Sequence, residues 1–317
     1  MTDEKFFSFY GVTTGGSSIM RIFPRWAEHL GLETTRIEGT DLPIHADAEV
    51  YRERVERLKS DPAELGALVT THKIDLYRAC RDLFDYVDPL AELCGETSCL
   101  SKRDGKLRAH AKDPISAGKS LDEFLPPGYW ERGGGEVLCL GAGGSAIAIA
   151  LHLLRSRPPA DRPRRIVIVN RSQPRLDALR EVVEQVDADV PFEYVRNEDP
   201  AGNDEIMEGL SPGSLVINAT GRGKDTPGSP ITDRGRFPRE AIAWELNYRG
   251  ELDFLQQARA QEGERGLRVH EGWRYFIYGW TAVIEEVFDL SFDDSVIDQL
   301  TVIAEEVRNT TTGGGAR

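Results

Sequence analysis

The sequence predicts an α/β protein of two domains, and three observations support that prediction. The chain has 317 residues, more than one ordinary core needs and enough for two domains of common size. In the first third of the chain, apolar strand-like segments alternate with segments of helical periodicity, which favours mainly parallel sheets. Further on, a glycine-rich turn joins a short apolar strand to an alanine- and leucine-rich helix.

The first domain shows the alternation most clearly. We expect strands over 6–14, 34–38 and 67–70, and a turn at 103–106 between two short strands. Helices are expected in between, with apolar residues on one face at positions 19, 22, 23, 26 and 30 of one helix and 51, 55 and 58 of the next. A further helix from about Ile74 is expected to carry Tyr77, Cys80, Phe84 and Val87 on one face.

The rest of the chain continues the pattern. Residues 121–135 contain Pro and Gly clusters and are expected to form a connection. Strands are expected at 136–140, 165–169, 214–220 and 242–246, a helix at 145–155, and two C-terminal helices near 276–288 and 296–308.

Composition limits the classes of partner. The chain has 53 acidic and 39 basic residues, a formal charge of −14, which argues against binding nucleic acid or an anionic membrane but not against a small anionic ligand. No apolar run approaches the roughly 20 residues of a membrane helix, and the first residues lack the features of a secretory signal. We therefore expect a cytoplasmic protein whose partner is a small molecule.

Four cysteines, Cys80, Cys94, Cys99 and Cys139, are scattered through expected helices and strands. They lack the paired spacing of a zinc site, so we expect no metal. Cys94 and Cys99 lie close in sequence, and we interpret them as reduced buried thiols, as in a reducing cytoplasm.

The turn after the strand at 136–140 is the most informative motif. It reads Gly141-Ala142-Gly143-Gly144-Ser145-Ala146 and runs directly into a helix. The first glycine permits a tight turn, the second lets the backbone approach a pyrophosphate, and a small residue at 146 permits close packing. The helix N-terminus adds free N–H groups and a positive dipole. These residues are predicted to hold the phosphates of a dinucleotide; the alternative is a tight turn without a ligand.

The next strand ends where an NAD site places an acidic residue on the ribose hydroxyl. Here the sequence has Asn170-Arg171-Ser172, followed by Arg175. A guanidinium binds a 2′-phosphate through charge-assisted hydrogen bonds, whereas a carboxylate would repel it. The second domain is therefore predicted to be a doubly wound Rossmann-type domain for NADP. The alternative is that Arg171 is a solvated loop charge.

Together these motifs resemble the shikimate and quinate dehydrogenase family over nearly the whole chain. Asn170-Arg171-Ser172 matches the family's Asn-Arg-Thr, Asn218-Ala219-Thr220 matches its Asn-Ala-Thr, and the segment 245–248, Glu-Leu-Asn-Tyr, approximates its Asp-x-x-Tyr. The segment 67–73 is similar to the family's Asn-Val-Thr-x-Pro-His-Lys, and 111–114 to its Asn-Thr-Asp-Gly.

The resemblance implies an N-terminal α/β substrate domain over 1–115, an NADP-binding domain over 116–271, C-terminal helices over 272–310 that pack back on the substrate domain, and a loose tail over 311–317. It implies NADP-dependent oxidation of a secondary alcohol on a hydroxylated cyclic carboxylate, in aromatic amino acid biosynthesis, by a monomer or homodimer. It also implies that Asn218, Ala219 and Thr220 bind the cofactor.

The resemblance places the family's catalytic lysine and aspartate on Lys73 and Asp113. Oxidation of an alcohol needs a group that takes the hydroxyl proton. Free lysine has a pKa of about 10.4; partial burial lowers such a pKa, while an adjacent carboxylate holds the ammonium in place. Lys73 would exchange a proton with the substrate oxygen, and Asp113 would orient both the lysine and the substrate. The alternatives are a helix-capping surface lysine and a turn-forming aspartate before Pro114.

The substrate positions depart from the family pattern. Ser17, Ser18, Thr70 and Tyr248 remain as substrate-binding candidates, but the family's Asn falls on Ser98, its Gln on Gly279, and two small or methionine positions on Arg274 and Tyr275. Such swaps alter substrate choice, because a site that pairs a hydroxyl rejects ligands that leave its groups unsatisfied. Shikimate or an analogue is the expected substrate. The alternatives are a non-catalytic NADP-binding regulator and a quinate- or folate-type dehydrogenase.

Overall fold

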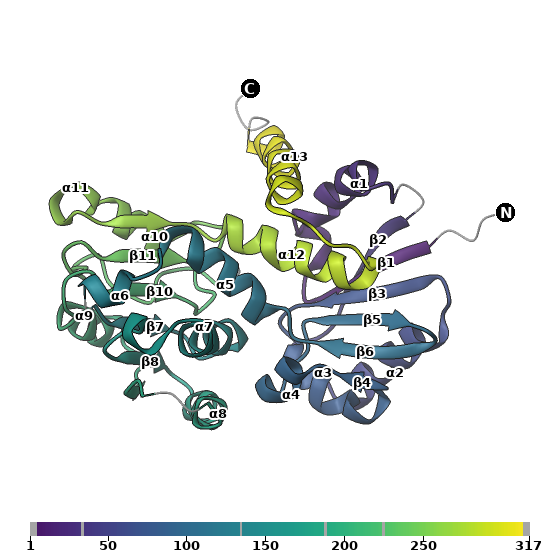
Figure 1. The fold of residues 1–317 in the computed structure, drawn as a ribbon, viewed down its shortest axis with the longest axis horizontal. Coiled ribbons are helices and arrows are strands. Elements are labelled where there is room, and N and C mark those ends of the chain that lie inside the picture. Colours follow the sequence, from purple (N-terminus) through teal and green to yellow (C-terminus); the bar gives the residue numbers. More distant parts are fainter. Residues whose placement is uncertain (1–4, 33–34, 134, 187–188, 224–225, 313–317) are drawn as a thin grey trace. The chain divides into compact units, whose positions relative to one another are not determined.

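The structure is a computed structural model that describes residues 5–32, 35–133, 135–186, 189–223 and 226–312. The chain forms two compact units (Figure 1). The first unit comprises residues 1–113 together with 277–317, and the second comprises residues 114–276. The C-terminal segment therefore returns to the unit in which the chain begins.

The first unit is built on a six-stranded sheet of the described residues, in the order β2-β1-β3-β5-β6-β4. Its strands are β1 (Lys5–Gly11), β2 (Thr35–Asp41), β3 (Glu64–Val69), β4 (Tyr86–Val87), β5 (Cys99–Arg103) and β6 (Lys106–His110). β1 pairs in parallel with both β2 and β3, but β5 is antiparallel to β3 and β6. The expected mainly parallel sheet is thus a mixed sheet, because the Asp104-Gly105 turn returns the chain as a hairpin.

The helices of this unit are α1 (Ile19–His29), α2 (Ala48–Ser60), α3 (Lys73–Cys80), α4 (Pro89–Cys94), the part of α12 (Trp273–Phe288) from residue 277, and α13 (Asp294–Thr312). Short 3₁₀ turns lie at η1 (Thr14–Gly16) and η2 (Arg81–Leu83). The prediction that Phe84 and Val87 continue the α3 face is wrong. Phe84 is extended and Val87 pairs with Ala109 in the sheet, although the Phe84 ring still packs on Tyr77.

The C-terminal helices cover part of the first unit. The Trp280 ring on α12 makes edge contacts with Phe7 and Phe9 of β1. α13 packs beside α1, and Trp26 Nε1 donates a hydrogen bond to the Leu300 carbonyl at 2.8 Å (Figure 1). Of the segment 311–317 predicted as a loose tail, residues 311 and 312 belong to α13, and 313–317 lie outside the described residues.

The second unit contains a six-stranded sheet of described residues, in the order β12-β11-β10-β7-β8-β9, in which every pair is parallel. Its strands are β7 (Val137–Leu140), β8 (Ile166–Asn170), β9 (Phe192–Arg196), β10 (Leu215–Asn218), β11 (Ile242–Glu245) and β12 (Arg268–His270). Numbered within the unit, the order is 6-5-4-1-2-3, the doubly wound arrangement of dinucleotide-binding domains. The predicted fold class is confirmed.

Its helices are α5 (Asp113–Phe124), α6 (Tyr129–Gly133), α7 (Gly144–Arg155), α8 (Gln173–Glu184), α9 (Pro200–Glu208), α10 (Asp253–Arg259) and α11 (Glu262–Arg265), with a 3₁₀ turn at η3 (Pro159–Asp161). The connection predicted over 121–135 therefore contains the end of α5 and the whole of α6. Tertiary packing overrides the weak helix propensity of α5: Gly118 lies so close to His152 that an added Cβ would be 2.3 Å from the imidazole.

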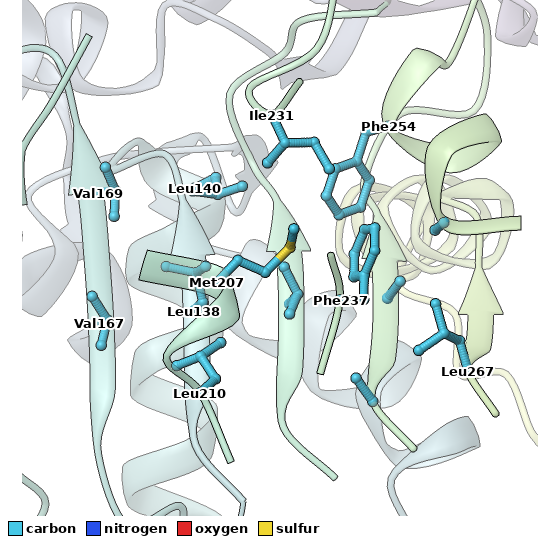
Figure 2. Close-up of a cluster of buried hydrophobic side chains, with 14 residues drawn as sticks. Leu138, Leu140, Val167, Val169, Met207, Leu210, Ile231, Phe237, Phe254 and Leu267 are labelled. Carbon is cyan, nitrogen blue, oxygen red and sulfur yellow. The ribbon is translucent and has the colours of Figure 1, made fainter. Parts of the chain in front are cut away.

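An apolar cluster holds β7 and its neighbours in place (Figure 2). Leu138 and Leu140 of β7 lie in the same cluster as Val167 and Val169 of β8 and Met207 of α9. These side chains are at most 3% exposed, so the strand that leads into the glycine-rich turn is fixed by a dry core.

Candidate active site

The first unit brings Lys73 and Asp113 together. Lys73 is the first residue of α3 and follows a sharp turn in which Thr71 has φ of +63°. Asp113 begins α5, shortly after β6 ends. Lys73 Nζ donates to Asp113 Oδ2, and the two side chains are 18% and 11% exposed. The pair is therefore held together while part of each side chain stays accessible.

Candidate substrate residues gather at one edge of the same sheet. β1 and β3 are parallel neighbours, and Ser17 and Ser18 follow the carboxyl end of β1 as Thr70 follows that of β3. Ser17 is buried, and its N–H donates to the Thr14 carbonyl at 2.9 Å. The Thr70 N–H donates to the Tyr10 carbonyl at 3.0 Å. Both loops therefore leave the sheet on the side where Lys73 begins its helix.

Two other polar residues near the pair are buried and hydrogen-bonded. His72 is buried, and its Nδ1 lies 3.1 Å from Tyr51 Oη. Burial lowers the pKa of His72, which favours the neutral ring at pH 7. Ser98 is 2% exposed, and its Oγ accepts a hydrogen bond of 2.8 Å from the Lys112 N–H. Ser98 thereby helps to position the segment that carries Asp113.

Glu96 is a residue of this region that the sequence reasoning missed. It is 1% exposed, and neither of its carboxyl oxygens has a hydrogen-bond partner among the described residues. Burial and, to a smaller extent, the charge of Asp113 raise the pKa of Glu96, the charge of Lys73 opposes them, and the result is a pKa of about 7. Nothing in the local sequence marks Glu96 as buried, because it follows the left-handed cap Gly95 of a short helix, where an exposed residue is expected.

In the second unit, the glycine-rich turn has the geometry of a phosphate loop. Gly141 has φ of +123°, and a Cβ at that position would lie 2.4 Å from the Ala219 carbonyl oxygen. Its N–H donates to the Val169 carbonyl at 2.8 Å, and the Ala219 N–H donates to the Leu140 carbonyl at 2.7 Å. The turn thus runs between the ends of β8 and β10, and α7 starts at Gly144, where the first N–H groups of a helix have no partner within the helix.

The two predicted arginines lie beside this loop. The Asn170 side chain accepts from the Ser172 N–H at 3.1 Å, which fixes the turn that carries Arg171. A Cβ built on Gly143 would lie 3.6 Å from an Arg175 guanidinium nitrogen. Both arginines are exposed, and neither guanidinium forms a hydrogen bond or ion pair with any other residue that the structure describes. Two cationic groups are therefore available next to the loop.

The Asn218 side chain stabilises the segment that follows β10, which carries Ala219 and Thr220. Its side chain is fully buried, donates to Glu245 at 2.7 Å and accepts from the Thr220 Oγ1 at 2.6 Å. Glu245 also accepts from the Asn247 N–H at 2.8 Å, and burial raises its pKa to about 7. Asn218 therefore holds Ala219 and Thr220 in place. Arg222 contributes its carbonyl to the same network, and Lys224, its companion in the loop, lies outside the described residues.

Known proteins are similar to this chain in sequence and in fold. The shikimate dehydrogenase (NADP(+)) of Symbiobacterium thermophilum is 30% identical over 243 residues, which cover 72% of this chain and 76% of the relative. The enzyme of the same name from Streptococcus thermophilus is 30% identical over 57% of this chain and 59% of its own. The chain belongs to the shikimate dehydrogenase family. No family model matches it.

Solved structures agree with this membership at the level of the fold. The shikimate 5-dehydrogenase of Thermus thermophilus, in complex with NADP(H) and shikimate, has a TM-score of 0.68 at 24% identity and covers 95% of this chain and 99% of its own. The quinate dehydrogenase of Corynebacterium glutamicum, in complex with NAD, has a TM-score of 0.71 at 18% identity, with 96% and 99% covered. The resemblance inferred from the motifs is confirmed.

Three positions at which this chain differs from the family pattern, and the substrate candidate Tyr248, lie in the following surroundings. Arg274 Nε donates to Glu123 at 2.6 Å, so its charge is balanced within the second unit. Tyr275 Oη lies 3.1 Å from Ser145 Oγ, in the first turn of α7. A Cβ added at Gly279 would meet no atom within 4 Å. Tyr248 belongs to the second unit and packs its ring on Phe276, with ring centroids 4.4 Å apart.

Other sequence predictions concern thiols and metals. All four cysteines are free and buried, which confirms the interpretation of Cys94 and Cys99 as reduced thiols. Burial raises the pKa of Cys80 and of Cys139 to about 12.

Within the described ranges, no group of three His, Cys, Asp or Glu side chains is arranged to hold a metal. In the same ranges, no helix has the length and apolar character needed to cross a membrane.

Proposed function

We propose that this chain catalyses reversible hydride transfer between NADP and a secondary alcohol on a carboxylated, hydroxylated ring of the shikimate type. The observation that supports this most directly is the partly buried Lys73–Asp113 pair, in a member of a family whose curated relatives are NADP-dependent shikimate dehydrogenases. The first unit would bind the substrate and the second the cofactor.

The residues of the second unit fit NADP. Gly141 leaves no space for a Cβ, so the backbone turns tightly and the first amides of α7 face the position of a diphosphate. Arg171 and Arg175 supply guanidinium groups that have no partner among the described residues and are of the kind that bind a 2′-phosphate. When bound, NADP supplies the hydride acceptor and NADPH the donor. Ala142, Gly143, Gly144, Ser145 and Ala146 complete the loop, and Asn170, Ser172, Asn218, Ala219 and Thr220 complete its surroundings.

The residues of the first unit move the proton. Lys73 Nζ takes the proton of the substrate hydroxyl in oxidation and returns it in reduction. Asp113 holds Nζ in one orientation and stabilises the ammonium. Ser17, Ser18 and Thr70 lie at the same sheet edge and, with Ser98, are the candidates of the first unit that orient the substrate; Tyr248 is a candidate of the second unit. The substrate is the finer part of this proposal, because the positions 98, 274, 275 and 279 differ from the family pattern.

The experiment follows the absorbance of NADPH with a panel of hydroxylated cyclic acids that includes shikimate and quinate. Lys73→Met should lower kcat by about 10²- to 10⁴-fold with little change in the Kd for NADP, because general acid–base groups contribute on that scale. Lys106→Met, an exposed lysine in the hairpin of the same unit, is the matched control. Equal turnover by wild type and Lys73→Met would refute the catalytic assignment.

The same panel separates the alternatives. NADP binding without turnover on any member would favour the non-catalytic regulator, and turnover of a methylene-tetrahydrofolate would favour the folate-type enzyme. We also propose a cytoplasmic location, since four buried free thiols fit a reducing compartment. We also propose that the protein is a monomer or a homodimer, and light scattering of the purified protein distinguishes these two states.

A further inference from the structure

The first unit contains a buried carboxyl that the proposed reaction does not use. Glu96 is 1% exposed, and both of its oxygens are without a hydrogen-bond partner among the described residues. An ionised carboxyl in such surroundings is unfavourable, because it has lost water and gained no hydrogen bond in exchange. Glu96 therefore favours its neutral form, or needs a nearby cation when it ionises.

The backbone ties Glu96 to the segments that carry the catalytic pair. The Glu96 N–H donates to the Ala91 carbonyl at 3.3 Å, and the next residue, Thr97, donates its N–H to the Lys73 carbonyl at 3.2 Å. Thr97 Oγ1 donates to the His110 carbonyl at 3.1 Å, at the end of the strand that leads to Asp113. Glu96 is thus fixed between the first turn of α3 and the end of β6.

The elements around Glu96 carry several titratable side chains: Lys73 and Tyr77 on α3, Asp88 and Glu92 at α4, His110 and Lys112 at and after β6, and Asp113 on α5. Most of these side chains form hydrogen bonds or ion pairs with residues other than Glu96. Asp88 caps α4 and lies 3.3 Å from the His110 ring, Lys112 pairs with Glu286 at 2.7 Å, and Tyr77 and Arg81 contact Glu92. The charges that act on the Glu96 carboxyl are those of Asp113 and Lys73.

We propose that Glu96 is a positioning residue that sets the charge around the Lys73–Asp113 pair. While protonated, it leaves Asp113 as the single anion beside the lysine; when ionised, it adds a second anion that stabilises the ammonium form. This proposal rests on the proposed function, because Glu96 acts on the reaction only through the proton that Lys73 carries. Since burial and Asp113 raise the pKa of Glu96 to about 7, the change in charge falls within the physiological range.

The consequence for the reaction follows from the proton balance. In oxidation, the substrate carbon loses a hydride to the cofactor and the hydroxyl loses its proton to Lys73 Nζ, so the rate rises with the fraction of neutral lysine. In reduction the same proton returns from the ammonium to the new hydroxyl, so the rate falls as the ammonium disappears. An ionised Glu96 therefore moves both pH limbs to higher pH.

The test compares wild type with Glu96→Gln, which keeps the shape of the side chain and removes its charge. The measurement is kcat/KM for oxidation and for reduction from pH 6 to 10. Both limbs should move to lower pH in the variant by about one pH unit, a roughly tenfold rate difference on the slope, as expected for one nearby buried charge. A merely structural role would lower the rate at every pH and leave the limbs where they are, and that result would overturn the proposal.

Glu92→Gln is the matched control, because Glu92 is an exposed residue of the preceding helix that pairs with Arg81. Its limbs should match those of wild type. A second measurement needs no substrate. The ¹³Cε resonance of Lys73, followed by NMR, should titrate at lower pH in Glu96→Gln than in wild type. If no panel member is turned over, the proposed function fails and this titration still decides the role of Glu96. Coincident titrations of Lys73 in the two proteins would refute that role.

Discussion

The residues proposed to hold NADP come from three short segments, each directly after a strand of one parallel sheet. Gly141 follows β7, Arg171 follows β8 and Ala219 follows β10. In the first unit, by contrast, Lys73 and Asp113 are separated by a helix, a short strand, another helix and a hairpin. The proposed cofactor site therefore depends on turn chemistry that repeats along the chain, whereas the proposed proton-transfer site depends on how distant segments pack.

Each unit also buries one carboxyl whose pKa is raised to about 7, and the two are satisfied differently. Glu245 accepts hydrogen bonds from Asn218 and from the Asn247 N–H. Glu96 accepts none from the described residues and lies beside a charged pair. A satisfied buried carboxyl acts as part of the scaffold, whereas an unsatisfied one next to a lysine changes the charge of a site.

The largest expected effect on binding tests the proposed phosphate loop. Gly141→Val places a β-branched residue at φ of +123° and a Cβ 2.4 Å from the Ala219 carbonyl oxygen, so the loop cannot keep its shape. NADP affinity measured by calorimetry should fall by at least about 100-fold, since strain of this kind amounts to about 3 kcal/mol. Gly263→Ala, where an added Cβ meets no atom within 4 Å, should bind NADP like wild type. Unchanged affinity in Gly141→Val would contradict the phosphate-loop assignment.

The next prediction concerns Glu245 as scaffold. Its folded-state pKa of about 7 lies above the ordinary value of 4.5, so the folded protein binds the extra proton and stability falls as pH rises between these values. The loss amounts to about 3 kcal/mol by pH 8, to order of magnitude. In urea unfolding at pH 5 and pH 8, Glu245→Gln should lose less stability than wild type by about that amount. Equal losses would show that Glu245 titrates normally.

A smaller effect is expected for the choice between cofactors. Arg171→Ala removes a guanidinium proposed to bind the 2′-phosphate, so the ratio of NAD to NADP dissociation constants should fall by about 10- to 100-fold, the scale of one charge-assisted contact. Arg259→Ala, an exposed arginine of α10 in the same unit, serves as the control. A ratio that stays constant in Arg171→Ala would assign the phosphate to Arg175 or to neither residue.

The smallest effect has the opposite sign and belongs to the first unit. Gly279 lies inside α12, and an added Cβ would meet no atom within 4 Å. Gly279→Ala should therefore raise the free energy of unfolding by about 0.5–1 kcal/mol, because alanine has the better helix propensity. Gly66→Ala is the contrast: its Cβ would lie 2.5 Å from the Leu100 carbonyl oxygen, so that variant should be destabilised. Destabilisation of Gly279→Ala would show that the space is filled.

Much of the second unit could be predicted from sequence. The strand at 137–140, the turn and the helix at 144–155 follow their local patterns, and the Asn170-Arg171-Ser172 turn falls at the end of β8 as expected. Less of the first unit could be predicted. The apolar spacing of Phe84 and Val87 indicated a helix, but both residues reach their neighbours from an extended segment. α5 was missed because its glycine and serines are weak helix formers in isolation.

The sequence by itself determined the fold class and the glycine-rich turn between β7 and α7, and it predicted a role for this turn and the nearby arginines, because strand periodicity, glycine turns and helix starts are local properties of the chain. It also pointed to Lys73 and Asp113, but only through family motifs. The tertiary structure alone decided that these two side chains form an ion pair, that Ser98 positions the segment before Asp113, and that Glu96 is buried beside the pair. Burial and electrostatic coupling depend on residues far apart in sequence, which no local pattern encodes.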